Sequence, residues 1–309
     1  MLYANVTDAA ERIVTTSAGE LRVRVVGPKD AATPPVVFVH GFLVDSTLWD
    51  GVAERLAAAG VTSYLVDWPL GSHRTPMSPD AALSPQAVAD LIDEVLATLG
   101  LDDVTLVGND TGGAICQLLV ASHPARIGRL VLTNCDAFDN FPPKAFVPLF
   151  AAARHPLLTR ALLAPMGLRP LRHSPMAFGM LLRKPRDAAL TEGWISPARH
   201  DARIRDDIAR FARGLDRRCL VDAEAALARF TRPVRIVWGA KDRNFGIGTA
   251  RRLAELFPAA ELIEVPGVST FVPVDAPDAV AAAILDVQGQ SSAANAAAAR
   301  AAPSVATGR

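Results

Sequence analysis

The chain has 309 residues, half of them hydrophobic, which suits one large domain or a domain with an insert. Lys and Arg together number 32, and so do Asp and Glu, so the formal net charge is zero. This balance predicts neither a nucleic acid nor a membrane as a partner. Three cysteines, Cys116, Cys135 and Cys219, do not make a disulfide framework.

The start of the chain gives no sign of a targeting segment. Residues 1–12 lack the apolar core of a signal peptide, and no apolar run is long enough to span a bilayer. We therefore expect a cytoplasmic protein, a monomer or a homodimer, that acts on a small molecule. The sequence indicates no cofactor and no metal site.

The N-terminal part alternates predicted strands with predicted helices. The first two strands alternate in polarity around a turn, as in a hairpin with one solvated face, and the next two are apolar throughout, as in strands buried on both faces. These strands cover residues 12–16, 20–26, 36–39 and 61–67, and the helices cover residues 49–59 and 85–99. Such alternation predicts a mostly parallel sheet with helices on both faces.

A strand, a sharp turn and a helix are predicted next. β-Forming residues at 104–107 end in Gly108, Asp110 follows two residues later, and two more glycines precede a helix at 114–122. This pattern is that of a nucleophile elbow with Asp in place of Ser, because glycines let backbone pack on backbone while the tip residue takes a strained conformation. The alternative is a surface turn in which Asp110 caps the helix.

The alternation breaks after a strand at 130–133. Residues 137–231 show no buried-strand pattern, and at 201–218 apolar residues recur at helical spacing, so we predict an all-helical cap for 137–231. This segment has 16 basic and 9 acidic residues, a net charge of +7, and the rest of the chain has −7.

The strand–helix alternation resumes after the cap. Strands are predicted at 234–238 and 261–265, and helices at 249–256 and 276–287. The core would thus comprise residues 1–136 and 232–287, with a sheet of about eight strands. Residues 288–309 are Ala, Ser and Gly without pattern, and we predict a disordered tail there.

Four anchors in this order resemble the α/β-hydrolase fold, and within it the Asp-nucleophile branch that includes haloalkane dehalogenases and epoxide hydrolases. The anchors are His40-Gly41-Phe42, Gly108-Asn109-Asp110-Thr111-Gly112-Gly113, the cap, and Trp238-Gly239-Ala240-Lys241-Asp242. The resemblance covers roughly residues 12 to 287.

The resemblance implies a role for several residues. Asp110 would be the nucleophile, and the backbone N–H groups of Phe42 and Thr111 would form the oxyanion hole. Asp242 would be the acid that orients the catalytic base. Asp136 is the alternative acid of some relatives, but we interpret it as a turn or helix-capping residue.

The catalytic histidine of that family is missing. Its loop reads Pro266-Gly267-Val268-Ser269-Thr270-Phe271-Val272-Pro273, which puts Thr270 in the histidine position, and no histidine follows Asp242. A threonine does not take a proton at neutral pH. Either another base activates water, or an ester on Asp110 does not turn over, or the reaction never forms one.

Other residues near the predicted site have two interpretations each. His73 lies on a loop that can border the pocket, although such histidines are often exposed and inert, whereas His40 is expected to support the oxyanion turn. Trp194 is a halide donor or a packing residue, and Cys135 lines the pocket or fills the core. Asp242 itself could activate water if the histidine position admits one.

Two hallmarks of the relatives are absent. The chain has only two tyrosines, Tyr3 and Tyr64, and neither lies in the cap, which disfavours ordinary epoxide opening. Thr111 replaces the tryptophan that follows the nucleophile in many dehalogenases.

Three functions remain open from the sequence. The leading hypothesis is a hydrolase for a haloalkane, ester, lactone or epoxide-like molecule, with Asp110 as nucleophile or general base. The alternatives are a cofactor-free lyase or isomerase in which Asp110 only moves a proton, and a non-catalytic small-molecule binder.

Overall fold

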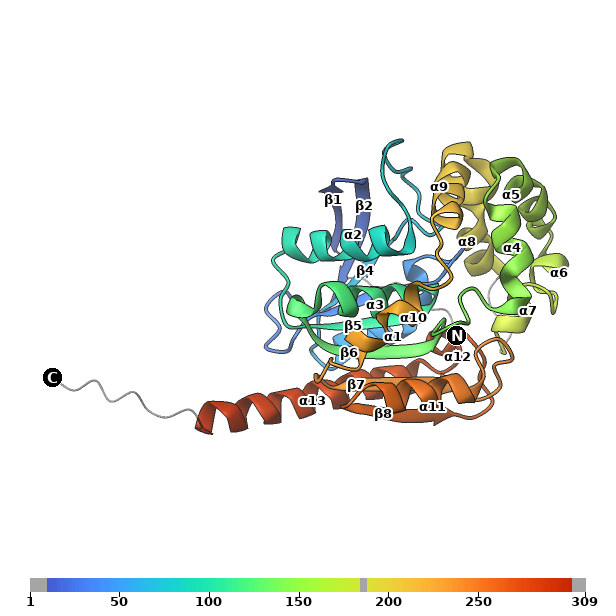
Figure 1. The fold of residues 1–309 in the computed structure, drawn as a ribbon. Helices are drawn as coiled ribbons and strands as arrows, with labels where there is room; N and C mark the ends of the chain where they lie inside the picture. The colour runs from blue at the N-terminus through green and yellow to red at the C-terminus, as the bar shows by residue number, and fades with distance from the viewer. Residues whose placement is uncertain (1–9, 184–187, 302–309) are drawn as a thin grey trace.

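One eight-stranded sheet forms the centre of the molecule (Figure 1). The computed structural model describes residues 10–183 and 188–301. The strands are β1 (Ala10–Thr16), β2 (Gly19–Val26), β3 (Val36–Val39), β4 (Ser63–Val66), β5 (Val104–Asp110), β6 (Ile127–Cys135), β7 (Val234–Gly239) and β8 (Ala260–Val265). Their order is β1-β2-β4-β3-β5-β6-β7-β8, and only the β1–β2 and β2–β4 pairs are antiparallel. The predicted fold class is confirmed.

The strand order brings the predicted site together. Strands β3, β5, β6 and β7 are parallel neighbours, so their carboxyl ends meet at one edge of the sheet. Each of these strands is buried along its whole length, except for the last residue of β5, Asp110, which is partly accessible. The site therefore lies where the central strands end.

Helices cover both faces of the sheet, which explains the apolar runs of its central strands. Val37 and Val39 of β3 face one hydrophobic layer, and the alternate residues Val36 and Phe38 face the other. The first layer holds α2 (Pro85–Thr98), α3 (Thr111–Ser122), α10 (Cys219–Leu227) and α11 (Ile247–Leu256). The second holds α1 (Asp50–Ala58), α12 (Val272–Asp275) and α13 (Pro277–Ala301).

Short helices form the cap at one end of the core (Figure 1). They are η3 (Lys144–Phe146), α4 (Val147–Ala153), α5 (Pro156–Leu163), η4 (Ala164–Gly167), α6 (Arg169–Arg172), α7 (Phe178–Leu181), α8 (Ala188–His200) and α9 (Ala202–Arg213). No strand occurs among the described residues of this insert. Helix α10 packs on α3 of the core instead, so the cap ends before α10 rather than at residue 231 as predicted.

The predicted tail begins as a helix. Helix α13 continues to Ala301, whereas the sequence led us to expect disorder from residue 288. The physical reason is that alanine has the highest helix propensity, and the packed first turns of α13 already provide the nucleus from which the helix extends. Residues 302–309 lie outside the described residues. No helix in the described part of the chain has the length and apolar character needed to cross a membrane.

Candidate active site

Asp110 lies at the tip of a sharp turn between β5 and α3. Its backbone has φ 55° and ψ −132°, a conformation that residues with a side chain rarely adopt. The turn is possible because α3 starts in close contact with neighbouring strands: a Cβ atom on Gly112 would overlap the backbone of Val39, and one on Gly113 would overlap Cys135. The elbow predicted from the glycine spacing is present.

Backbone groups hold the Asp110 carboxylate. The N–H of Phe42 donates to Oδ2 of Asp110 at 3.2 Å, and the backbone N–H of Thr111 lowers the pKa of the same carboxyl group. Gly41 packs so closely against Asp110 that a Cβ atom there would overlap the carboxylate. The two N–H groups predicted for the oxyanion hole thus both act on the Asp110 side chain.

The Asp110 residue is the accessible point of an otherwise buried segment. Asn109 has no exposed surface and Thr111 only 2%, whereas Asp110 is partly accessible. Burial raises the pKa of Asp110 from its ordinary value of 3.8 to about 7, against the lowering effect of the Thr111 and Phe42 N–H groups, and Asp242 adds a small further rise. The carboxyl group is therefore divided between its acid and its base form at neutral pH.

Asp242 has four hydrogen-bond donors. Its Oδ1 accepts from the N–H groups of Asn244 (2.8 Å) and Phe245 (3.1 Å), and its Oδ2 accepts from Asn134 Nδ2 (2.9 Å) and Thr270 Oγ1 (2.8 Å). Burial nevertheless raises the pKa of Asp242, because these donors only partly offset desolvation. The fully buried Thr270 is thus one of the donors that hold the Asp242 carboxylate.

Two asparagines that the sequence analysis did not single out connect these parts. Asn134 Nδ2 reaches Asp242, and its Oδ1 accepts from the Gly239 N–H at 2.6 Å. Asn109 Nδ2 donates to the Thr270 carbonyl at 2.8 Å, while Asn109 Oδ1 has no partner. Their positions at the carboxyl ends of adjacent parallel strands were the only available signal.

His40 is committed to the loop after β3. Its Nε2 accepts from the Trp68 N–H at 2.9 Å, so Nδ1 carries the proton and donates to the Gly41 carbonyl at 3.0 Å. Burial lowers the pKa of His40, which keeps the ring neutral. Both nitrogens support the turn that presents Phe42, and neither is available as a catalytic base.

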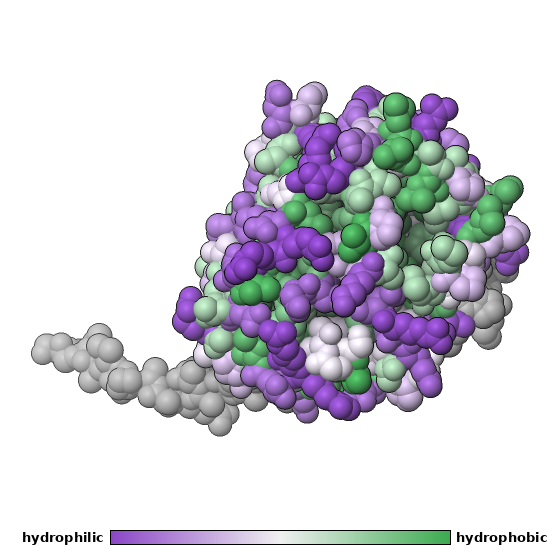
Figure 2. All heavy atoms as spheres, turned by 45° about the vertical axis from the view of Figure 1, so that its right-hand side comes forward, coloured by the Kyte–Doolittle hydropathy of each residue, from purple (hydrophilic) through white to green (hydrophobic). Residues whose placement is uncertain are grey.

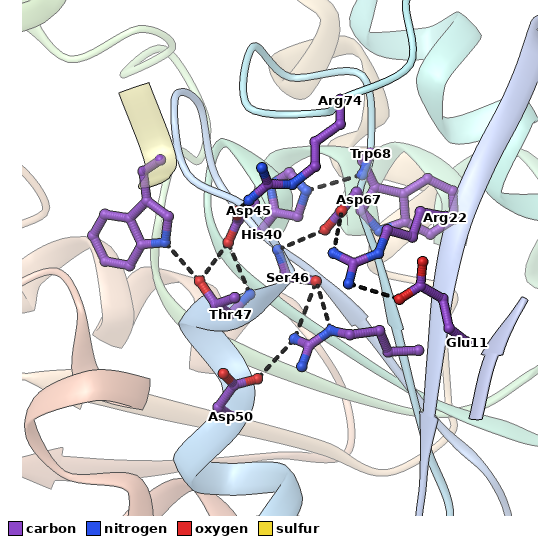
Figure 3. Close-up of polar contacts among 12 residues, drawn as sticks. Glu11, Arg22, His40, Asp45, Ser46, Thr47, Asp50, Asp67, Trp68 and Arg74 are labelled. Atoms are coloured by element: carbon purple, nitrogen blue, oxygen red, sulfur yellow. Dashed lines mark hydrogen bonds and ion pairs between the residues drawn. The ribbon is translucent and has the colours of Figure 1, made fainter. Parts of the chain in front are cut away.

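A polar network fixes the same loop from its other side (Figure 3). Asp67, at the end of β4, accepts from the Ser46 N–H at 3.2 Å and from Arg22. Asp45 caps the short helix η1 (Ser46–Trp49) through the Thr47 N–H. The loop that carries the Phe42 donor is therefore anchored to the sheet.

His73 is buried, so the exposed position considered for it is wrong. Its Nε2 lies 2.8 Å from Asp207 Oδ2 on α9, and its Nδ1 accepts from the Gly71 N–H at 3.4 Å. Asp207 also accepts from the Met77 N–H and pairs with Arg210. His73 thus joins the core to the cap.

Asp136 is also buried, directly after β6. Its Oδ2 lies 3.4 Å from Thr111 Oγ1, and its Oδ1 has no hydrogen-bond partner. Burial, with a further contribution from Asp110, raises the pKa of Asp136 well above its usual range. The Asp136 carboxyl group therefore lies behind the residue that follows Asp110.

Trp194 and Cys135 both have structural surroundings. Trp194 Nε1 donates to Thr47 Oγ1 at 2.9 Å, and its ring packs on Phe178 and Phe271, so its N–H is already used. Cys135 is fully buried beside Gly113, and burial raises the pKa of its thiol. Among the described residues, no group of three or more His, Cys, Asp or Glu side chains is arranged to hold a metal ion.

Comparison with known proteins agrees with this geometry. Residues 34–277 match the alpha/beta hydrolase fold family, and the chain belongs to that family. Haloalkane dehalogenase 2 of Mycobacterium tuberculosis (strain ATCC 25618 / H37Rv) is 30% identical over 207 residues, which cover 64% of this chain and 68% of that protein. A 2-hydroxy-6-oxononadienedioate/2-hydroxy-6-oxononatrienedioate hydrolase of Cupriavidus pinatubonensis is 25% identical, over 84% of this chain and 90% of that protein. The protein is a hydrolase of the α/β-hydrolase superfamily.

Solved structures share the fold. Haloalkane dehalogenase DbeA from Bradyrhizobium elkani USDA94 superposes with a TM-score of 0.74 at 19% identity, covering 94% of this chain and 100% of that one. An alpha/beta hydrolase fold protein from Burkholderia ambifaria gives 0.71 at 26% identity, covering 89% and 97%.

The contact between Gly41 and Asp110 predicts a specific coupling. Gly41→Ala should lower the free energy of unfolding by about 1–3 kcal/mol, because the added methyl group overlaps the carboxylate. The loss should largely vanish in an Asp110→Gly background, which also removes the Cβ atom that lies against residue 41, measured by urea unfolding as a double-mutant cycle. Gly193→Ala, where the methyl group meets nothing within 4 Å, is the control. Equal losses in both backgrounds would contradict the contact.

The raised pKa of Asp110 predicts a pH-dependent stability difference. Between about pH 4 and about pH 7 the folded state holds this proton more tightly than the unfolded state, so its stabilising effect is lost as the pH rises through 7. Asp110→Asn removes the effect, so the stability of the variant relative to the wild type should rise from about pH 4 to about pH 7 and stay level above that. The exposed Asp139→Asn serves as control in the same urea titrations. A difference that does not change with pH would show that the Asp110 pKa is ordinary.

Proposed function

We propose that the protein is a hydrolase that acts on a small organic molecule with an electrophilic carbon, such as a haloalkane, and that Asp110 is the group that attacks it. The observation that carries the proposal is the partly accessible Asp110 on a strained elbow, flanked by buried residues, with the Phe42 N–H donating to its carboxylate. Backbone strain of this kind at an accessible polar residue is typical of a functional site.

The arrangement of the donors supports a reacting carboxylate rather than a bound carbonyl substrate. Because the Phe42 N–H already donates to Asp110 Oδ2, it stabilises negative charge on the Asp110 side chain itself. In the proposed step, a carboxylate oxygen attacks the electrophilic carbon, the carbon–halogen bond breaks, and halide leaves with the electron pair. The N–H groups would then stabilise the oxyanion formed when water attacks the resulting ester.

The second half of such a reaction lacks its usual base. All four hydrogen bonds to Asp242 come from protein groups, including the Thr270 hydroxyl, so Asp242 has no free position for an attacking water. His40 and His73 are both engaged in other contacts. We therefore expect an ester on Asp110 to be long-lived with alkylating substrates.

One observation favours a second candidate function. A carboxyl group with a pKa of about 7 is matched to proton transfer at neutral pH, as a general base should be. Asp110 could then serve a lyase or isomerase that needs no covalent ester. The same experiment separates the two functions.

The proposal predicts a covalent adduct on Asp110. The protein is incubated with a panel of haloalkanes, esters, lactones and epoxides, and its intact mass is then measured by mass spectrometry. Peptide mapping locates any added mass. We expect an alkyl adduct on Asp110 whose rate of formation rises with pH through about 7, because only the ionised carboxylate attacks.

Asp110→Asn should abolish the adduct, and Asp139→Asn should form it like the wild type. Deuterium exchange from solvent into a substrate, without an adduct, would instead support proton transfer. Neither adduct nor turnover on any substrate would argue against both functions.

The contact between Thr270 and Asp242 predicts a gain of function. Thr270→His would place an imidazole next to Asp242, as in relatives with the complete set of residues. Release of the Asp110 adduct should then quicken by about 10²-fold or more, the range that a positioned base contributes. Thr270→Val removes the hydroxyl without adding a base and should leave the release rate unchanged. An unchanged release rate in a folded Thr270→His variant would mean that Thr270 does not occupy the base position.

A further inference from the structure

The cap exposes large apolar side chains to an unusual degree. Nine large hydrophobic residues are exposed in the described part of the chain, and seven of them lie between Val147 and Met176. The apolar patch consists of Leu157 (77% exposed), Leu158 (52%), Leu162 (42%), Leu168 (64%), Leu171 (48%) and Met176 (91%). Figure 2 shows apolar residues gathered over the cap.

These residues lie on neighbouring elements. Leu158 and Leu162 are four residues apart on α5 and share one helix face, as Leu168 and Leu171, three apart, do at α6. Helix α5 contacts η4, and η4 contacts α6, so these elements together carry the leucines of the apolar patch on the outer layer of the cap. Helices α8 and α9 lie between this layer and the core, because Trp194 and Asp207 contact core residues.

The segment that carries the apolar patch has charges of one sign. From Asn140 to Arg186 the sequence has eight Lys or Arg residues and no Asp or Glu. Lys144, Arg154, Arg160 and Arg169 are exposed, and none of these side chains forms an ion pair with another described residue. An exposed apolar surface bordered by unpaired cations matches the headgroups and acyl chains of an anionic bilayer.

We propose that the apolar patch and its basic border bind the surface of an anionic membrane, with the protein lying on the bilayer rather than spanning it. A second copy of the chain is a poorer occupant of the same face, because a symmetric contact would bring the unpaired cations of two caps together. The proposal departs from the expectation, drawn from total charge, that no membrane is bound. The zero net charge of the chain is the sum of +7 for residues 137–231 and −7 for the other residues.

Vesicle sedimentation tests the proposal with the full chain. Vesicles of equal parts phosphatidylglycerol and phosphatidylcholine should bind the protein at about 20 mM NaCl, and about 500 mM NaCl should reduce binding severalfold by screening. Vesicles of phosphatidylcholine alone should bind at least about tenfold less. Equal binding to both kinds of vesicle, or none to either, would overturn the proposal.

Surface variants locate the contact. Leu157→Asp with Met176→Asp should reduce binding by about tenfold or more, and Arg160→Glu with Arg169→Glu should remove the preference for phosphatidylglycerol. Ile13→Asp, at a residue that is 56% exposed on β1, is the matched control and should bind like the wild type. Thermal unfolding of each variant checks that these exposed changes leave the fold intact.

Analytical ultracentrifugation addresses the competing occupant. A wild-type dimer that becomes a monomer in the Leu157→Asp/Met176→Asp variant, together with no vesicle binding, would show that a second copy covers the apolar patch and would overturn the proposal.

Discussion

The structure around the candidate site depends on holding the Asp110 carboxylate where burial disfavours its charged form. Asp110 is desolvated, backbone-strained and in contact with Gly41, and its pKa of about 7 reflects that environment. Two backbone N–H groups compensate in part, and glycines at 112 and 113 allow α3 to approach the sheet closely enough to supply one of them. His40 and Asp67 fix the loop that supplies the other. Many of the buried polar groups at the carboxyl ends of these strands thus help to position the Asp110 side chain.

If Thr270 occupies the position of the family's histidine, as we propose, the replacement leaves the fold intact for an electrostatic reason. Loss of the partner of a buried carboxylate is costly when nothing takes its place. Here Asp242 retains four donors, and Thr270 supplies one of them. The site therefore loses a proton acceptor without gaining an unpaired buried charge. Stability and turnover are separable at this position.

The sequence predicted those features that depend on local patterns. The strands, the elbow at Asp110 and the position of Thr270 follow from apolar runs, glycine spacing and the loop around Pro266-Gly267, each read within about ten residues. The predicted helix at 201–218 corresponds to α9, whose Ile204, Ile208 and Phe211 are fully buried.

The features that escaped prediction depend on contacts between distant residues. His73 meets Asp207 across 134 positions of sequence, and Asn109 meets Thr270 across 161, so neither partner identifies the other locally. The burial of Asp136 beside Thr111 is likewise a consequence of how β6 packs next to β5. The tail was misjudged for a different reason: its uniform Ala content was interpreted as lack of order, although alanine favours the helix that α13 continues.

The cap has an inner and an outer layer, which differ in how they contact the core. This difference affects whether binding to the outer layer disturbs the site at Asp110. The inner layer is fixed to the core by buried polar contacts, Trp194 to Thr47 from α8 and Asp207 to His73 from α9. Breaking such contacts would leave buried polar groups unsatisfied, which favours a cap that stays closed over the elbow. The outer layer, which comprises α5, η4 and α6, carries exposed leucines and unpaired arginines, and among the described residues it forms no hydrogen bond with the core. A partner that binds the outer layer would therefore contact the cap without competing with the groups that position Phe42 and Asp110, so surface binding and chemistry at Asp110 are physically independent.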